Sequence, residues 1–129
     1  MANSTVPGLL TSYSTIHSIG VEWDIVGDDN HNCVVTTQYR VLGTGTFLNA
    51  LNLIRVDYAL RNMMAGSIFF LSPGTSYEVK LDLVDADGGS ESRTTTVSTR
   101  VLPVLPTGGQ TYHVVPGAGG GDGSEGNPF

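Results

Sequence analysis

The sequence predicts an all-β protein, a seven-stranded antiparallel Greek-key β-sandwich with a glycine-rich C-terminal tail. Two observations lead to this fold class. Apolar and polar residues alternate with a period of two in several runs, and clusters of turn-forming residues separate the runs. Because successive side chains point to opposite faces of a strand, this period indicates strands with one buried face.

Composition and charge narrow the classes of function. The chain has 129 residues, 40% of them hydrophobic, which suits one core. Its net charge of -6 repels phosphate backbones and anionic lipid headgroups, so we expect no nucleic-acid partner. No apolar run approaches the roughly 20 residues that span a bilayer, so we expect no membrane insertion. The single cysteine, Cys33, cannot form an internal disulfide, and we expect it to be a small buried residue.

The first strands are predicted in the N-terminal third. Ile19, Val21 and Trp23 alternate with polar or small residues, as a half-buried strand requires. Residues 35–41 alternate in the same way, and the turn formers of residues 27–31 separate the two runs. The two runs are compatible with a hairpin and equally with separate Greek-key partners.

The middle of the chain is ambiguous. Residues 47–64 lack Gly and Pro and carry enough apolar residues to form a helix. The all-β context favours extended segments with an irregular crossover, because residues 67–71 have a strand-like composition. Met63 and Met64 would then be flexible gap fillers beneath the crossover.

The last strands and the tail follow. Residues 77–83 alternate strictly, residues 85–89 form a turn, and the β-branched residues 93–99 predict the final strand. Residues 102–106 contain two prolines and predict a semi-rigid exit. We therefore divide the chain into a sandwich, residues 1–106, and a linker or start of another unit, residues 107–129, which holds eight of the 17 glycines.

Residues 71–77, Leu-Ser-Pro-Gly-Thr-Ser-Tyr, have the pattern of a tyrosine corner, in which a buried tyrosine bonds back to the preceding turn. Together with Trp23, the Tyr39-Arg-Val strand and the acidic turn at residues 84–89, this pattern resembles the immunoglobulin-like fibronectin type III domain. The resemblance covers about residues 6–104. The lead-in at residues 63–71 is longer than in ordinary members and resembles the variant that precedes a right-handed parallel β-helix in bacterial secreted or surface proteins.

Residues 112–129 resemble the first strand and glycine-rich turn that open pectate-lyase-like β-helices. This resemblance implies an extracellular or cell-surface location and a carbohydrate-associated parent protein. It also implies that any catalytic residues belong to later coils, so none is assigned to this chain.

No constellation in the sequence predicts catalysis or a cofactor. His17, His31 and His113 are scattered without metal-ligand spacing, and no serine lies in a nucleophile elbow. The acidic turns resemble the front of a calcium loop at Asp85-Ala-Asp-Gly, but no glutamate follows at the required spacing, so an ordinary hairpin turn is favoured. We expect no enzymatic activity, no metal and no cofactor.

The candidate interaction surface consists of exposed aromatic residues. Phe69 and Phe70 are consecutive, so within a strand one of them must point away from the core, and we expect it to contact a neighbouring domain. Tyr58 and Tyr112 complete the candidate set. Tyr13 and Phe47 are the other rings not assigned to an inner face.

From these observations we expect a non-catalytic structural, spacer or accessory module of a larger secreted or surface carbohydrate-associated protein. The expected partner is a neighbouring domain of the same polypeptide. The alternatives are a carbohydrate-binding module that contacts polysaccharide, and a fragment of a polysaccharide lyase or hydrolase whose catalytic β-helix is absent.

Overall fold

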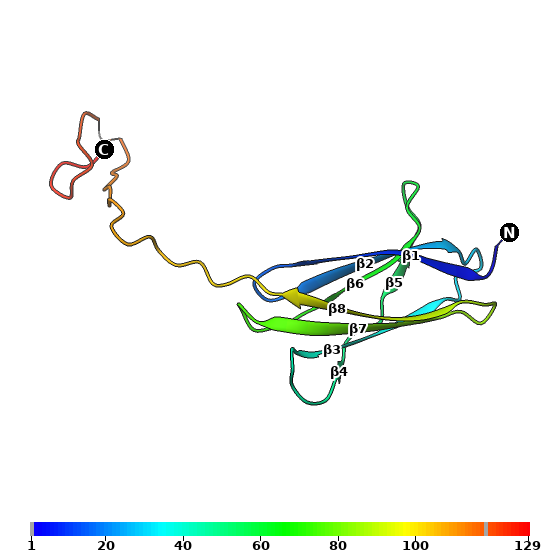
Figure 1. Cartoon of the computed structure of the whole chain (residues 1–129). Coiled ribbons are helices and arrows are strands. Elements are labelled where there is room, and N and C mark those ends of the chain that lie inside the picture. Colours follow the sequence, from blue (N-terminus) through cyan, green and yellow to red (C-terminus); the bar gives the residue numbers. More distant parts are fainter. Residues whose placement is uncertain (1, 118) are drawn as a thin grey trace.

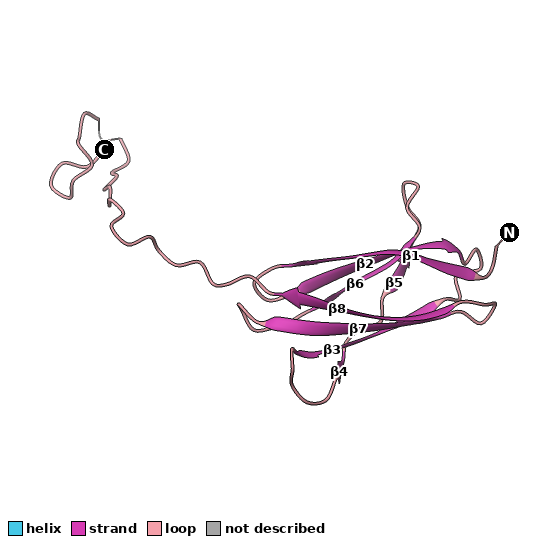
Figure 2. Ribbon diagram, in the orientation of Figure 1, coloured by secondary structure: helices cyan, strands magenta, loops and turns pink. Residues whose placement is uncertain are grey.

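The structure, a computed structural model, describes residues 2–117 and 119–129. Eight strands form two facing layers (Figures 1 and 2). In chain order they are β1 (Thr5–Ser14), β2 (Ile19–Gly27), β3 (Val34–Val41), β4 (Leu48–Asn49), β5 (Ile54–Val56), β6 (Met63–Ile68), β7 (Ser76–Val84) and β8 (Ser90–Ser98). Among the described residues, no helix has the length and apolarity needed to cross a membrane.

The two sheets have the strand orders β1-β2-β6-β5 and β4-β3-β7-β8, and every pairing is antiparallel. β2 pairs with β1 and β6, whereas β3 pairs with β4 and β7. The strands β2 and β3 therefore lie in different sheets, and of the two alternatives the Greek-key arrangement is the one formed. The predicted fold class is confirmed, with the two-residue β4 as an additional strand.

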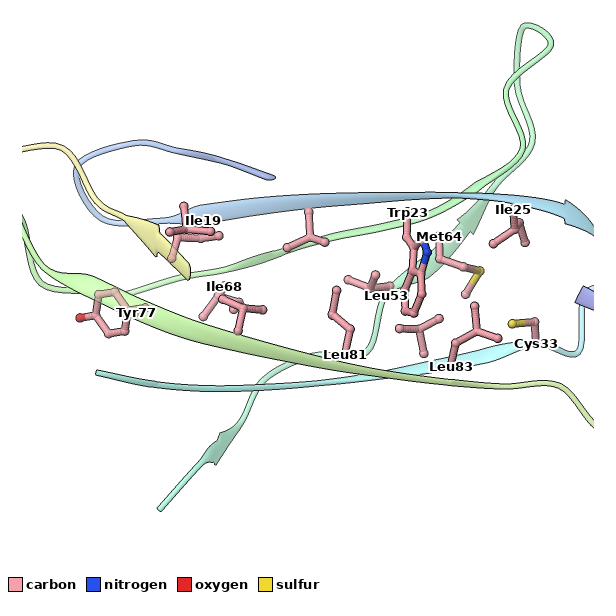
Figure 3. Packing of buried hydrophobic residues seen from close by; sticks show 14 of the residues in the cluster. Ile19, Trp23, Ile25, Cys33, Leu53, Met64, Ile68, Tyr77, Leu81 and Leu83 are labelled. Atoms are coloured by element: carbon pink, nitrogen blue, oxygen red, sulfur yellow. The ribbon is translucent and has the colours of Figure 1, made fainter. Parts of the chain in front are cut away.

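The core lies between the inner faces of the two sheets (Figure 3). Trp23 is fully buried at the centre of β2, and Leu81 is fully buried on the facing β7. The alternation predicted for β2 and β7 is confirmed, because their inward residues are the buried ones. In β3 it is confirmed for Val35 and Thr37, whereas Val41 at the end of the strand is 41% exposed. The largest fully buried side chains are Trp23, Ile19, Leu81, Leu83, Val21, Val35, Val79 and Asp28.

The first strand, β1, had no counterpart among the predicted elements. Its sequence contains Pro7 and Gly8, which interrupt a strand pattern. The pairing of β1 with β2 shifts register between Pro7 and Leu10, so a bulge accommodates both residues. Gly8 is required there because a Cβ would lie 2.9 Å from the backbone oxygen of Asp24.

The ambiguous segment, residues 47–64, is extended. It forms β4, crosses to the other sheet, forms β5 and enters β6. Backbone bonds hold the crossover against β3: the amide of Ala50 donates to the oxygen of Thr37 at 2.9 Å, and the amide of Leu53 donates to the oxygen of Val35 at 3.0 Å. The extended alternative is therefore correct, and the helical one is not.

The chain enters and leaves the sandwich at opposite ends (Figure 1). At the end that we call the entry pole, the amide of Thr5 donates to the oxygen of Gly88 in the β7–β8 turn. At the opposite end, the exit pole, the amide of Arg100 donates to the oxygen of Thr15 in the β1–β2 turn. The linker that begins at Arg100 leads away from the exit pole.

Candidate interaction surface at the exit pole

The β6–β7 loop is fixed to the exit pole by a tyrosine corner. The Tyr77 hydroxyl accepts a hydrogen bond from the amide of Ser72 at 2.9 Å, and the Thr99 hydroxyl donates to the oxygen of Ser72 at 2.6 Å. Leu71 is buried, and its amide donates to the oxygen of His17 at 2.9 Å. These contacts confirm the predicted corner and leave residues 71 and 72 little freedom.

Phe69 and Phe70 lie between this fixed loop and the end of β6. The expectation that they share a strand, with one ring directed inward, is wrong, because β6 ends at Ile68. Ile68 and Leu71 both enter the core, so the two residues between them are displaced outward. Their exposed fractions are 54% for Phe69 and 100% for Phe70.

The backbone of Phe70 has a φ of 61°, in the left-handed region. A residue with a side chain pays about 1–2 kcal/mol to adopt this conformation, and such strain concentrates at binding sites. The flanking anchors at Ile68 and Leu71 hold the strained residue in place. The fold thus presents the Phe70 ring to solvent in a defined position.

A groove of about 350 Å³ lies beside the two rings. It forms where the two sheets are open at their side, because β5 pairs with β6 only as far as Ala65 and β4 pairs with β3 only at Gln38 and Tyr39. None of the described residues that line it is charged. The lining residues are Tyr39, Asn49, Ala50, Leu51, Ser67, Ile68, Phe69 and Phe70. We call this feature the exit-pole groove.

The other two candidate residues lie elsewhere. Tyr58 is 81% exposed and begins a tight turn in which Ala59 and Leu60 have φ values of 53° and 66°. This turn projects from the half of the sandwich nearer the entry pole (Figure 1). Tyr112 belongs to the tail, where its ring centroid lies 5.7 Å from that of Phe129. The structure therefore groups Phe69 and Phe70, but neither tyrosine joins them.

Sequence reasoning did not identify Leu51 and Tyr39 as part of this surface. Leu51 is 75% exposed and lies in the crossover, where no periodicity marks its orientation. Tyr39 alternates as an inner-face strand residue, and its ring does pack on Tyr77, with centroids 6.2 Å apart. The crossover brings Leu51 to the groove beside Phe70, whereas Tyr39 reaches it from β3.

Two other aromatic residues have internal contacts. The Tyr13 ring covers Gly20, its cross-strand partner on β2, where a Cβ would lie 2.3 Å from the ring. The Arg40 guanidinium lies over the Phe47 ring at 4.4 Å from the centroid. These contacts give both rings a role within the domain.

The acidic turns lie together at the entry pole, and their carboxylates accept hydrogen bonds from other groups of the protein. Asp28 is buried, pairs with Arg55, and accepts the amides of Asn32 and Cys33 at 2.9 and 3.0 Å. The side-chain amides of Asn30 and Asn32 donate to Asp87 at 2.6 and 2.7 Å and lower the pKa of that carboxyl. In residues 2–117 and 119–129, no group of three or more His, Cys, Asp and Glu side chains is arranged to hold a metal ion.

Cys33 lies beneath this network, as expected of a small buried residue. Its exposed fraction is 8%. Burial is the largest cause that raises the pKa of the Cys33 thiol, and the nearby carboxylates of Asp28 and Asp85 raise it further. The thiol therefore stays protonated well above neutral pH.

The tail contains a small hydrogen-bonded unit. The amide of Phe129 donates to the oxygen of His113, and the amide of Val115 donates to the oxygen of Phe129, both at 3.0 Å. Phe129 thus bonds to His113 and Val115, the two residues that flank Val114. This is the hydrogen-bond pattern of a parallel pair, so Phe129 lies parallel to Val114. Gly123 fits between the rings of Tyr112 and Phe129.

Comparison with known proteins shows the fold. No protein-family model matches the chain, and no match was found among curated proteins. The fn3 domain of the human collagen alpha-1(XX) chain is similar, with 23% identity and a TM-score of 0.57 over 84% of this chain and 94% of that one. The third fibronectin III domain of the human KIAA0343 protein has 15% identity and a TM-score of 0.53 over 79% and 86%.

A computer-redesigned β-sandwich protein is also similar, with 15% identity and a TM-score of 0.53 over 75% of this chain and 96% of that one. At these identities the likeness concerns architecture. The chain has the fold of a fibronectin type III domain, as the resemblance in the sequence implied.

Proposed function

We propose that the chain is a non-catalytic spacer module of a larger secreted or surface protein. The pole-to-pole path of the chain carries this proposal. The first strand is bonded into the entry pole through Thr5, and Arg100, just beyond the last strand, is bonded into the exit pole. Because the chain enters at one pole and leaves at the other, the domain separates the segments on its two sides by its full length. For nine-residue strands this length is about 30 Å.

The linker supports the same role. Pro103 and Pro106 fix backbone angles and favour an extended conformation, which makes a semi-rigid spacer. The preceding residue Val101 packs near Gly74 of the β6–β7 loop. This contact restricts the direction in which the linker leaves the sandwich.

The tail supports a parallel β-helix as the following domain. Its resemblance to the opening of such domains lies in residues 112–129, and the parallel pairing of Phe129 with Val114 is the pairing that a β-helix repeats in every coil. In this proposal the neighbouring domain is the principal partner, and carbohydrate chemistry belongs to that domain. The location is extracellular or on the cell surface.

Distance measurements between two spin labels test the spacer role. In a Cys33→Ala background, labels at Asn3→Cys and Thr107→Cys report the span from the entry pole to the end of the linker. We expect a narrow distribution centred at about 55 Å, from strands of about 3.3 Å per residue and an extended linker of about 3.1 Å per residue. Pro103→Gly with Pro106→Gly should broaden the distribution and shorten its mean.

A second label pair, Asn3→Cys with Thr44→Cys, lies within the sandwich and serves as the control. Its distribution should not change when the prolines are replaced. Equal widths for the original linker and the double glycine variant would mean that the linker is already flexible, and the spacer role would then fail.

A second candidate function is the binding of a neutral polysaccharide. The exit-pole groove favours it, because its walls combine aromatic rings with the amide of Asn49 and the hydroxyl of Ser67 and carry no charge. Calorimetric titration with neutral oligosaccharides tests this candidate. Saturable binding that Asn49→Ala weakens would support it, and the absence of heat at millimolar sugar would exclude it.

A further inference from the structure

We propose that two copies of this chain associate end to end through their exit poles, with the Phe70 ring of each copy entering the exit-pole groove of the other. The inference concerns a surface that the spacer role does not use. Its occupant is a second copy of the chain.

The first argument is the self-complementary shape of this surface. Phe70 is fully exposed and stands at the rim of the groove that it partly lines. A projecting ring beside an apolar groove on the same face meets the condition for a twofold interface, in which the same patch is used by both subunits. A rotation of one copy by 180° brings each ring to the other copy's groove.

The second argument is the strained backbone of Phe70. Its φ of 61° costs the isolated chain free energy without burying the ring. The anchors at Ile68 and Leu71 keep the ring in this position before any contact forms. A pre-positioned aromatic side chain loses little conformational entropy on binding, which is typical of interface anchors.

The third argument is the area available. Phe69, Phe70 and Leu51 line the groove and are each more than half exposed. Together they present about 400 Å² of apolar surface, given the size of such side chains. A twofold interface would bury about 800 Å² in total, which is at the low end of weak and transient complexes. We therefore expect dimers only at high protein concentration.

The fourth argument is the distribution of charge. The exit-pole groove is uncharged, whereas the buried and exposed carboxylates of Asp28, Asp29, Asp85 and Asp87 lie at the entry pole. Contact through the exit-pole groove keeps the acidic ends away from the interface, farther from it than the Debye length of about 8 Å. Contact through the entry poles would bring these like charges together.

Sedimentation velocity of the complete chain tests the proposal between about 10 µM and about 1 mM, where weak complexes form. We expect a monomer at the lowest concentration and a rising weight-average sedimentation coefficient at the highest. Amide shifts on dilution should be confined to Tyr39, residues 49–51 and residues 67–70.

Phe70→Gly is the decisive variant, because glycine accepts the positive φ while the ring is removed. Association should weaken at least tenfold, and the free energy of unfolding should be unchanged or higher. Leu51→Ser should also weaken association, although it leaves the Phe70 ring in place. Leu60→Gly is the matched control, since Leu60 is also fully exposed with a positive φ but lies away from the exit pole; its dimer should be unaffected.

Several results would overturn the proposal. These are a monomer at about 1 mM, a dimer that persists in Phe70→Gly, or a loss of association in Leu60→Gly. Dilution shifts confined to the tail around Tyr112 would assign the contact to another surface. A strictly monomeric chain whose groove binds a neutral oligosaccharide would replace the second copy with that ligand.

Discussion

The guanidinium of Arg93 lies over the indole ring of Trp23, 5.0 Å from the ring centroid. The same side chain donates a hydrogen bond to the backbone oxygen of Gly8 at 2.6 Å and pairs with Glu91. Arg93 therefore closes the side of the sandwich where the edge strands β1 and β8 approach each other. An inward-pointing charge on an edge strand also disfavours pairing with another chain at that edge.

Replacing Arg93 with alanine should lower the free energy of unfolding by about 1–2 kcal/mol, because the cation–π contact and the bond to Gly8 are both lost. Urea unfolding followed by Trp23 fluorescence measures the change. Arg61→Ala is the control, since its pair with Glu22 is exposed and should change stability by less than about 0.5 kcal/mol. Equal effects of the two substitutions would contradict the role assigned to Arg93.

The tyrosine corner should be sensitive to loss of a single oxygen. Tyr77→Phe keeps the buried ring but removes the acceptor of the Ser72 amide, so we expect a loss of about 1–2 kcal/mol in unfolding free energy. The midpoint of urea unfolding should fall while the slope stays constant. Tyr13→Phe, on a half-exposed ring, should have little effect; a neutral result for Tyr77→Phe would mean that the hydroxyl does not stabilise the corner.

Replacing only one member of the buried ion pair of Asp28 and Arg55 should strongly lower the free energy of unfolding. Their side chains are 1% and 14% exposed. Arg55→Met leaves the Asp28 carboxylate without its cation and should cost about 3–5 kcal/mol. Adding Asp28→Asn should recover part of that loss in a double-mutant cycle. No recovery would show that the two side chains contribute independently.

The Cys33 thiol should react slowly in the folded protein. Burial raises its pKa above the usual value of 9.0, so the reactive thiolate is scarce at pH 8. Alkylation should be much faster in urea than in buffer. Because the folded pKa is the raised one, this group's contribution to stability is complete below pH 9.0 and is lost as pH rises through the folded pKa. Equal alkylation rates in the two conditions would contradict burial of the thiol.

The hydrogen-bonded structure of the tail should require Gly123, whereas the stability of the sandwich should not. Gly123 has a φ of 81°, and a Cβ there would lie 2.5 Å from the Tyr112 ring and 2.6 Å from the Phe129 ring. Gly123→Ala should abolish hydrogen-exchange protection of the Val115 and Phe129 amides. Gly126→Ala is the control, because a Cβ at Gly126 meets no atom within 4 Å. Retained protection in Gly123→Ala would contradict the parallel pairing.

The elements predicted correctly from the sequence are those fixed by local chemistry. Strict alternation marks β2, β3 and β7, and the tyrosine corner is encoded within seven consecutive residues. β1 was missed because Pro7 and Gly8 are tolerated only through a bulge against β2, which depends on the partner strand.

The candidate site was predicted only in part, because it is assembled by tertiary structure. Phe69 and Phe70 were identifiable as neighbouring rings, but their common exposure follows from the burial of Ile68 and Leu71 on either side. Leu51 reaches the same groove by a crossover whose course has no sequence period. The contact of Arg93 with Trp23 likewise joins strands that are far apart in the chain.

The spacer role rests most directly on the stiffness of the linker, which ¹⁵N relaxation of the complete chain measures. The account predicts that the amides of Val101, Leu102, Val104 and Leu105 keep order parameters close to the value of about 0.85 found in the rigid strands. Order parameters below about 0.6 from Val101 onward would contradict it, because a freely moving linker cannot hold a following domain in a defined orientation.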